Sequence, residues 1–130
     1  MLKCNISKTA IDRAGNALAK EKFKTYEEWE AADKIFDEFR QAHLQPLTST
    51  TIAIQNWFRA DNASYIIVQR LKRKPQILKK LRRLNTRLTQ LQDIGGLRII
   101  VDQNSDVDRL IEYMLNSTCK CNRILINNLF

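Results

Sequence analysis

The chain has 130 residues and a formal net charge of +8 at pH 7. This length allows one domain with a modest core, and an apolar content of 44% excludes a largely disordered or low-complexity chain. No apolar run approaches the roughly 20 residues that cross a bilayer, and the first residues lack the apolar segment of a secretory signal. A cytoplasmic protein without a membrane span is therefore expected.

The cysteines do not predict a disulfide framework or a zinc site. Cys4, Cys119 and Cys121 form an odd number, which leaves at least one thiol unpaired. The Cys-x-Cys pair lacks two further ligands, because the only histidine, His43, lies far away in the sequence. Reduced thiols are the expected state.

The first 60 residues predict a helical region. Ser7 can cap a helix over about 8–20. Thr25 and Glu28 form a capping box for a second, amphipathic helix. The apolar positions of these helices and of a third one are expected to form core rather than a ligand site, and the aromatic members are Trp29, Phe36, Phe39, Trp57 and Phe58.

Strands and helices alternate after a turn at 61–62. The β-branched and aromatic run Tyr65–Val68 predicts a strand. Pro75 stands at the first position of a short helix. A second strand is predicted at Leu97–Val101, and Ser105 is expected to cap the helix that follows.

Two further signals complete the predicted order. Thr48 or Ser49 is expected to cap the third helix, and one possible strand, Arg123–Ile126, lies near the end of the chain. Helices followed by alternating strands and helices indicate an α+β fold, in which a mixed sheet is flanked by helices. We expect an N-terminal helical cap over 1–60 and the sheet-forming part over 61–130, within one structural domain overall.

The positive charge is concentrated in one segment. Ten basic side chains share residues 70–98 with a single carboxylate, Asp93, so this segment has a formal charge of +9 and the rest of the chain has −1. A concentrated cationic site beside one acidic residue suits a polyphosphate and its divalent metal. A solvated basic helix face is the alternative explanation of such a pattern.

The spacing of the segment brings several of its side chains together. Arg70 and Lys72 are two residues apart at the end of a strand, so they share one face. Gln76 and Lys80 are four apart on the next helix and share one side of it. A strand end that leads into a helix N-terminus also favours anion binding. The stripe that faces the core is expected to consist of Ile77, Leu81 and Leu84.

The single carboxylate precedes the second strand. Gly95 and Gly96 follow Asp93 and allow close backbone approach. A carboxylate at this point is well placed to hold Mg²⁺, which prefers one or two carboxylates plus substrate phosphate oxygens. Arg98, inside the strand, could reach the same site or pair with Asp93.

These paired motifs resemble the synthetase domain of the RelA/SpoT family. The resemblance is strongest over Gln69–Val101, where Arg70-x-Lys72 and Lys80-Leu81 precede Asp93-Ile-x-Gly-x-Arg98-x-Ile. It implies a nucleotidyltransferase-like mixed sheet flanked by helices. It also implies GTP pyrophosphokinase activity, in which the β,γ-pyrophosphate of ATP moves to the 3′-hydroxyl of GTP or GDP and (p)ppGpp forms.

The resemblance implies a role for each matching residue. Arg70 would contact the adenine of ATP, and Lys72 and Lys80 would hold its phosphates. Asp93 would bind Mg²⁺, and Arg98 would support the same catalytic site.

The chain departs from the family pattern at several points. Gln76, a further expected ATP contact, stands where the family commonly has Ser or Thr. The family's Gly-Tyr-x-Ser-(Ile/Leu)-His segment and its second acidic residue, usually Glu, are not found, and Glu112 on a predicted helix does not substitute for the latter. We expect a domain that keeps the ATP side and lacks most of the acceptor side, with compromised turnover. The incomplete sheet would have open edges that favour pairing with another chain, as in a homo-oligomer.

A nucleic-acid-binding module that uses the basic segment 70–98 is the alternative. A basic stripe at helical spacing permits it, with a steep dependence on salt. The sequence has no helix-turn-helix, zinc-finger or RNA-recognition signature, and its aromatic residues are not interleaved with the basic ones. Nucleic acid is therefore a less favoured partner than ATP. A decayed fold kept for protein interaction has no direct support.

Overall fold

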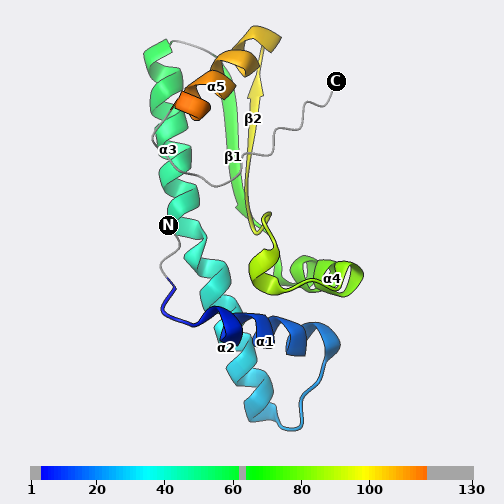
Figure 1. The fold of residues 1–130 in the computed structure, drawn as a ribbon. Helices are drawn as coiled ribbons and strands as arrows, with labels where there is room; N and C mark the ends of the chain where they lie inside the picture. Colours follow the sequence, from blue (N-terminus) through cyan, green and yellow to red (C-terminus); the bar gives the residue numbers. More distant parts are fainter. Residues whose placement is uncertain (1–3, 62–63, 117–130) are drawn as a thin grey trace.

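The computed structural model describes residues 4–61 and 64–116 of the chain. The predicted order of helices and strands is confirmed over these residues, and the fold is α+β (Figure 1). The predicted strand Arg123–Ile126, with Cys119 and Cys121, lies outside the described residues. The elements are α1 (Lys8–Lys20), α2 (Tyr26–Ala42), α3 (Leu44–Asp61), β1 (Tyr65–Leu71), α4 (Lys74–Leu84), η1 (Leu88–Gln90), β2 (Gly95–Val101) and α5 (Asn104–Asn116).

The first two helices begin where the sequence predicts. The Ser7 hydroxyl accepts a hydrogen bond from the Ala10 amide at 3.2 Å, and the Thr25 hydroxyl accepts one from the Glu28 amide at 3.2 Å. The Glu28 carboxylate accepts from the backbone N–H of Lys24 at 3.0 Å, one residue before the position that a full capping box uses. Both caps satisfy amide groups that the first helical turn leaves without partners.

The third helix begins earlier than predicted. It starts at Leu44, so the expected cap at Thr48 or Ser49 was wrong. Pro46 is the third residue of this helix, and its missing N–H costs nothing in the first turn, where amide groups have no partner inside the helix. The Thr50 hydroxyl instead donates to the Pro46 carbonyl within the helix, at 2.9 Å.

The last described helix also begins before its expected cap. It starts at Asn104, so Ser105 lies inside the first turn, where its hydroxyl donates to the side-chain oxygen of Gln103 at 3.3 Å. Leu110 is the buried residue of this helix. Its other apolar residues are half-buried or exposed, so α5 is less deeply embedded than α1.

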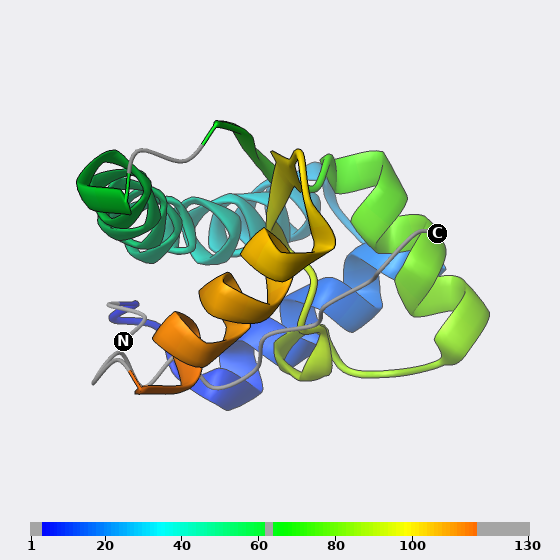
Figure 2. The same ribbon diagram turned by 90° about the horizontal axis from the view of Figure 1, so that it is seen from above.

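The two strands pair antiparallel over their whole length. Tyr65 lies opposite Val101 and Leu71 lies opposite Gly95, and both strands are longer than predicted. Alternate residues of each strand are half-buried, and those between them are exposed. Helix α3 runs beside the strands (Figures 1 and 2) and α4 lies beyond the end where β1 stops (Figure 1), and α3 and α5 pack on the same face of the sheet. The face toward α3 and α5 is therefore the covered one, and the opposite face is open.

Two apolar clusters hold the described residues together. The first joins α1, α2, α4 and η1, and its members include Ile11, Leu18, Phe36, Phe39, Ile77, Leu81, Leu88 and Ile94. The second joins α3, α5 and the covered face of the sheet around Ile54, Phe58 and Leu110. The Phe58 and Tyr65 rings stack here with centroids 4.4 Å apart. Ile94 of the first cluster and Leu97, which packs against the second, are three residues apart in sequence around the start of β2.

Two residues that were expected in the core are exposed. Trp29 is 39% exposed and Leu84 is 51% exposed. Leu84 is the last residue of α4, one turn beyond the buried Leu81. Trp29 lies in the first turn of α2, where it borders a hollow between helices. Both expectations failed because helical periodicity sets the direction of a side chain but not the extent of the surface that covers it.

Gly15 gives a test of the packing between α1 and η1. A Cβ atom at this position would lie 2.7 Å from the Cβ of Leu88, which is buried. Alanine favours a helix by up to about 1 kcal/mol over glycine, but overpacking typically costs about 1–3 kcal/mol. We therefore expect G15A to lower the free energy of unfolding by on the order of 1 kcal/mol in urea denaturation followed by circular dichroism.

Gly96 supplies the matched control. A Cβ atom there meets no other atom within 4 Å, so G96A is expected to change the free energy of unfolding by less than about 0.5 kcal/mol. Equal stability of G15A and the unsubstituted chain would show that α1 and η1 do not approach each other this closely.

Candidate functional site

Asp93 joins three elements through one of its carboxylate oxygens. The Nζ atoms of Lys72 and Lys80 each lie 2.7 Å from Oδ2 of Asp93 and donate to it. Lys72 follows β1, Lys80 lies in α4, and Asp93 comes just before β2. The carboxylate keeps two ammonium groups close together that would otherwise repel each other.

Backbone hydrogen bonds hold Lys72 in place. Its N–H donates to the carbonyl of Ile94 at 2.7 Å, which extends the pairing of the strands beyond Leu71. The Nε of Arg40, on α2, donates to the Lys72 carbonyl at 2.8 Å. The sequence carries no local signal for this contact, because the two residues are 32 positions apart.

Asp93 is ionised at neutral pH. Burial by itself would raise the pKa of its carboxyl group, but the hydrogen bonds and positive charges of Lys72 and Lys80 outweigh this effect. The pKa of Asp93 therefore lies below its ordinary value. The three side chains form a charged cluster with one positive charge in excess.

The second oxygen of Asp93 fits a metal ligand. Oδ1 is buried and has no hydrogen-bond partner among the described residues. Within residues 4–61 and 64–116, no three His, Cys, Asp or Glu side chains gather into a metal-binding group. A cation on Oδ1 would thus need ligands from a bound molecule, as Mg²⁺ does when it binds to a carboxylate and to phosphate oxygens.

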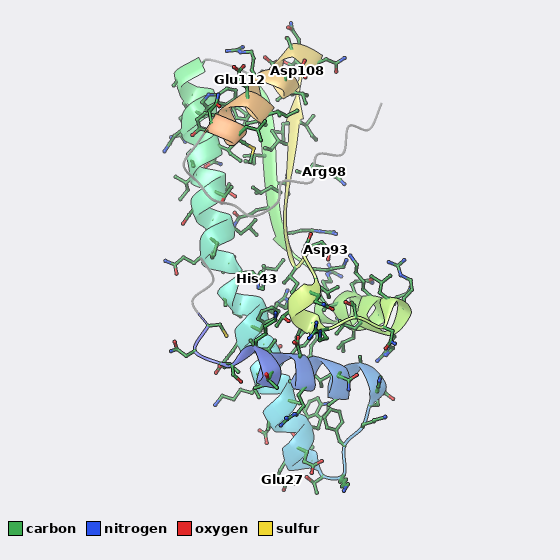
Figure 3. The ribbon with its side chains drawn as sticks, viewed as in Figure 1. Glu27, His43, Asp93, Arg98, Asp108 and Glu112 are labelled. Atoms are coloured by element: carbon green, nitrogen blue, oxygen red, sulfur yellow. The ribbon has the colours of Figure 1, made fainter. Side chains whose placement is uncertain are left out.

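Arg70 and Arg98 lie on the open face of the sheet. Arg70 is paired with Gly96, and Arg98 with Val68. Both arginines are exposed, and the register makes them diagonal neighbours on one face. Because side chains alternate along a strand, Lys72 continues this row from Arg70 toward α4. In Figure 3, Asp93 and Arg98 lie on the side of the strands away from α3.

Gln76 is the sixth residue expected at the site. It is exposed in the first turn of α4, one turn before Lys80. The structure thus brings Lys72, Lys80 and Asp93 into direct contact. It places the two arginines on the adjoining sheet face and Gln76 on the adjoining helix. The role of each in binding or catalysis stays a prediction.

Glu112 and Asp108 do not contribute to this site. Both lie on α5, which follows the far end of β2, whereas Asp93 precedes the near end (Figure 3). The expectation that Glu112 does not replace a second acidic residue at the site agrees with this placement.

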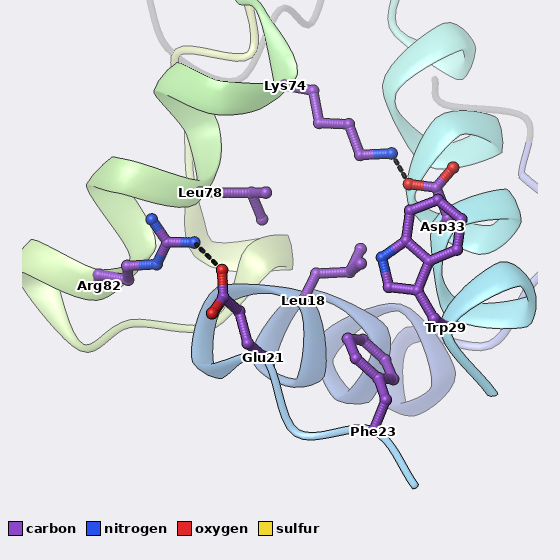
Figure 4. Close-up of a pocket in the computed structure, with 8 residues that line it drawn as sticks. All are labelled: Leu18, Glu21, Phe23, Trp29, Asp33, Lys74, Leu78 and Arg82. Carbon is purple, nitrogen blue, oxygen red and sulfur yellow. Dashed lines mark ion pairs between the residues drawn. The ribbon is translucent and has the colours of Figure 1, made fainter. Parts of the chain in front are cut away.

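A hollow of about 550 Å³ lies on the other side of α4, between α1 and α2 (Figure 4). Its walls include Leu18, Phe23, Trp29 and Leu78. Its charges are paired: Lys74 with Asp33, and Arg82 with Glu21 at 3.8 Å. Burial lowers the pKa of Lys74. The hollow does not include any residue of the Asp93 cluster, so we do not place the site there.

A family model described as a region found in RelA / SpoT proteins matches residues 69–125. The chain carries a RelA/SpoT-family domain. The RelA/SpoT match includes Lys72, Lys80 and Asp93, so the whole contact cluster lies inside it. Membership indicates a place in (p)ppGpp metabolism and the stringent response.

No curated protein matches the chain. The part of the RelA/SpoT match over 117–125 lies outside the described residues. Within the described ranges, no helix has both the length and the apolar character needed to cross a membrane.

The Asp93 cluster predicts a dependence of stability on pH. Because the pKa of Asp93 is lowered on folding, its contribution is present above the unfolded pKa and is lost as the pH falls through the folded pKa. At pH 7 we expect D93N to lower the free energy of unfolding by on the order of 1 kcal/mol. The difference from the unsubstituted chain should shrink below about pH 4, as measured by urea denaturation at several pH values.

Asp108 provides the control for this measurement. It is exposed on α5, and D108N is expected to have little effect between acidic and neutral pH. A destabilisation by D93N that is the same at low and at neutral pH would contradict the ionised lysine–carboxylate cluster.

Proposed function

We propose that the chain binds ATP with Mg²⁺ at the Asp93 cluster and acts as an alarmone synthetase. The pyrophosphate of ATP would move to the 3′-hydroxyl of GTP or GDP and give (p)ppGpp. The observation that carries the proposal is the joint contact of Lys72 and Lys80 with Asp93 inside the RelA/SpoT match.

The two lysines would exchange one anionic partner for another. In the ligand-free protein they neutralise Asp93, at 2.7 Å each. A triphosphate presents more negative charge than one carboxylate, so its oxygens can compete for the same ammonium groups. The carboxylate that is released would hold Mg²⁺ together with phosphate oxygens. When bound, the metal supplies further neutralisation of charge on the phosphates.

The arginines of the open sheet face would extend the site. Arg70 presents a planar guanidinium that can stack on adenine. Arg98 would add positive charge beside the reacting phosphates, and Gln76 would donate a hydrogen bond from its amide to a phosphate oxygen. Phosphoryl transfer depends mainly on such positioning and neutralisation of charge.

The reaction itself is a displacement at the β-phosphorus. A bond forms between the 3′-oxygen of the acceptor and the β-phosphorus of ATP, and the bond between this phosphorus and the bridging oxygen of the α-phosphate breaks. The 3′-hydroxyl loses its proton to solvent water in the same step. AMP leaves with that oxygen. The cations of the site stabilise the charge that spreads over the phosphate oxygens during this step.

Lysine substitutions test the proposed ATP site. K72A and K80A each remove a charge-assisted contact, so we expect each to weaken ATP–Mg²⁺ binding at least about tenfold in isothermal titration calorimetry. K34A, at an exposed position of α2, serves as the control and should bind as the unsubstituted chain does. ATP affinity unchanged by both K72A and K80A would overturn the proposal. Conversion of GTP or GDP to (p)ppGpp, followed by ion-exchange chromatography, tests the transfer step separately.

The metal requirement gives a second test of the same site. In the unsubstituted chain, Mg²⁺ should raise the affinity for ATP, and D93N should remove most of this increase because the carboxylate that holds the metal is lost. The measurement is ATP titration with Mg²⁺ and with EDTA. D108N is the matched control, and a D93N variant with an unaltered Mg²⁺ effect would exclude Asp93 as the ligand.

A further inference from the structure

Helix α4 and the residue before it carry a second set of cations, which are exposed and make no contact with Asp93. Ile77 and Leu81 are buried and define the inner side of the helix. At 3.6 residues per turn, Lys80 lies on the flank that meets Asp93, whereas Lys79 points almost directly away from Ile77. Arg83 follows Lys79 by one turn. Lys79 and Arg83 are both exposed, and we call them, with Arg73 just before the helix, the outer basic face.

The outer basic face has no carboxylate partner in the described part of the chain. Other cations of this helix have carboxylate partners: Lys74 pairs with Asp33 and Lys80 with Asp93. Within the described ranges, Arg73, Lys79 and Arg83 form no ion pair with any acidic group. Helix α4 contains no acidic residue, and like charges four residues apart destabilise a helix by about 0.2–0.5 kcal/mol.

The acidic side chains gather elsewhere in the molecule. Helix α2 has Glu27, Glu30, Asp37 and Glu38 at exposed positions. Figure 2 shows α4 at the margin of the fold, with the strands between it and α3. The outer basic face is therefore an uncompensated positive surface at the edge of the molecule, which can attract a polyanion from solution.

The proposed nucleotide site does not account for this surface. Lys80 contacts Asp93 from one flank of α4. The side chain of Lys79 projects from the same helix about 100° around its axis from Lys80. One triphosphate bound at Lys72 and Lys80 therefore leaves Lys79 in solvent. An extended anion with repeated charges suits the outer basic face better, because Lys79 and Arg83 repeat their charge along the helix axis.

We propose that the outer basic face of α4 binds the phosphate backbone of a nucleic-acid strand. Lys79 and Arg83 would each contact a phosphate group, and Arg73 would add a third contact. This face of the helix carries no aromatic side chain on which a base could stack, and Gln76 is the one amide side chain of α4, so binding would rest mainly on phosphate contacts and depend little on sequence. The proposal does not depend on the nucleotide site.

A membrane surface fits this face less well. Amphipathic helices bind to lipid by inserting an apolar stripe between the headgroups. The apolar stripe of α4 is buried against the core at Ile77 and Leu81. Only charge remains for the partner to contact. At an anionic membrane each Lys or Arg contributes only about 1 kcal/mol, whereas a phosphate backbone presents closely spaced charges and releases counterions on binding.

Fluorescence anisotropy on the full chain tests the proposal. The probe is a fluorescein-labelled single-stranded RNA of about 20 nucleotides, with RNA and DNA duplexes of the same length as further arms. K79Q/R83Q should weaken binding at least about tenfold at low salt. It should also reduce the slope of log K against log salt by roughly 1.4 for the single strand and roughly 1.8 for the DNA duplex, because two phosphate contacts are lost.

A second double variant controls for net charge. K22Q/K34Q removes the same two charges from exposed positions outside α4, and it should keep the affinity for RNA within about twofold. K72A and K80A should each keep the affinity for nucleic acid while their affinity for ATP falls. Failure of one proposal can therefore be distinguished from failure of the other.

Several outcomes would overturn the proposal. One is no binding of the unsubstituted chain to any of the three nucleic acids. Another is an equal loss of RNA affinity in K79Q/R83Q and K22Q/K34Q, which would mean that net charge alone determines the affinity. A third is binding to vesicles that contain phosphatidylserine with none to nucleic acid.

Discussion

The contact of two lysines with one carboxylate is the interaction on which the site depends. Lys72 comes from the end of β1, Lys80 from α4 and Asp93 from the residue pair that leads into β2. The residues that follow Asp93 take part in both apolar clusters, since Ile94 belongs to one and Leu97 packs against the other. Charge attraction between the two lysines and Asp93 therefore holds β1, α4 and the start of β2 together beside this apolar packing. A phosphate that replaces the carboxylate can use cations that the fold already holds close together.

Helix α4 separates its charges by direction. On one side Lys74 contacts Asp33 and lies over the ring of Phe36, with Nζ 5.3 Å from the ring centroid. On another flank Lys80 contacts Asp93. The side turned to solvent keeps positive charge without a carboxylate partner in the described part of the chain. The cations of this one helix thus have three different environments: Lys74 pairs with Asp33 on α2, Lys80 pairs with Asp93, and Lys79 and Arg83 are exposed to solvent.

The sheet contributes a surface as well as a support. Its covered face packs on α3 and α5, and the side chain of Gln69 accepts from Thr51 at 2.6 Å and donates to Thr48 at 3.3 Å. Its open face presents two arginines together with three exposed apolar side chains, which are Ile66, Val68 and Ile100. A planar base can lie on apolar atoms while its phosphates reach the cations beyond. The open face and the Asp93 cluster together make a surface suited to a nucleotide.

The sequence alone determined the elements and the identity of the charged segment, because both depend on neighbours along the chain. Caps at Ser7 and Thr25 and the apolar periodicity of each helix are local properties. The start of α3 was not predictable from Thr48 and Ser49. A proline is tolerated both before a helix and in its first turn, and Pro46 lies in the first turn of α3. Tertiary structure decided that Lys72 and Lys80 share one oxygen of Asp93, because this follows from how a strand and a helix pack across 13 to 21 residues of sequence. It also decided which cations of α4 have no carboxylate partner among residues 4–61 and 64–116, because an ion pair requires an acidic group that another element places nearby.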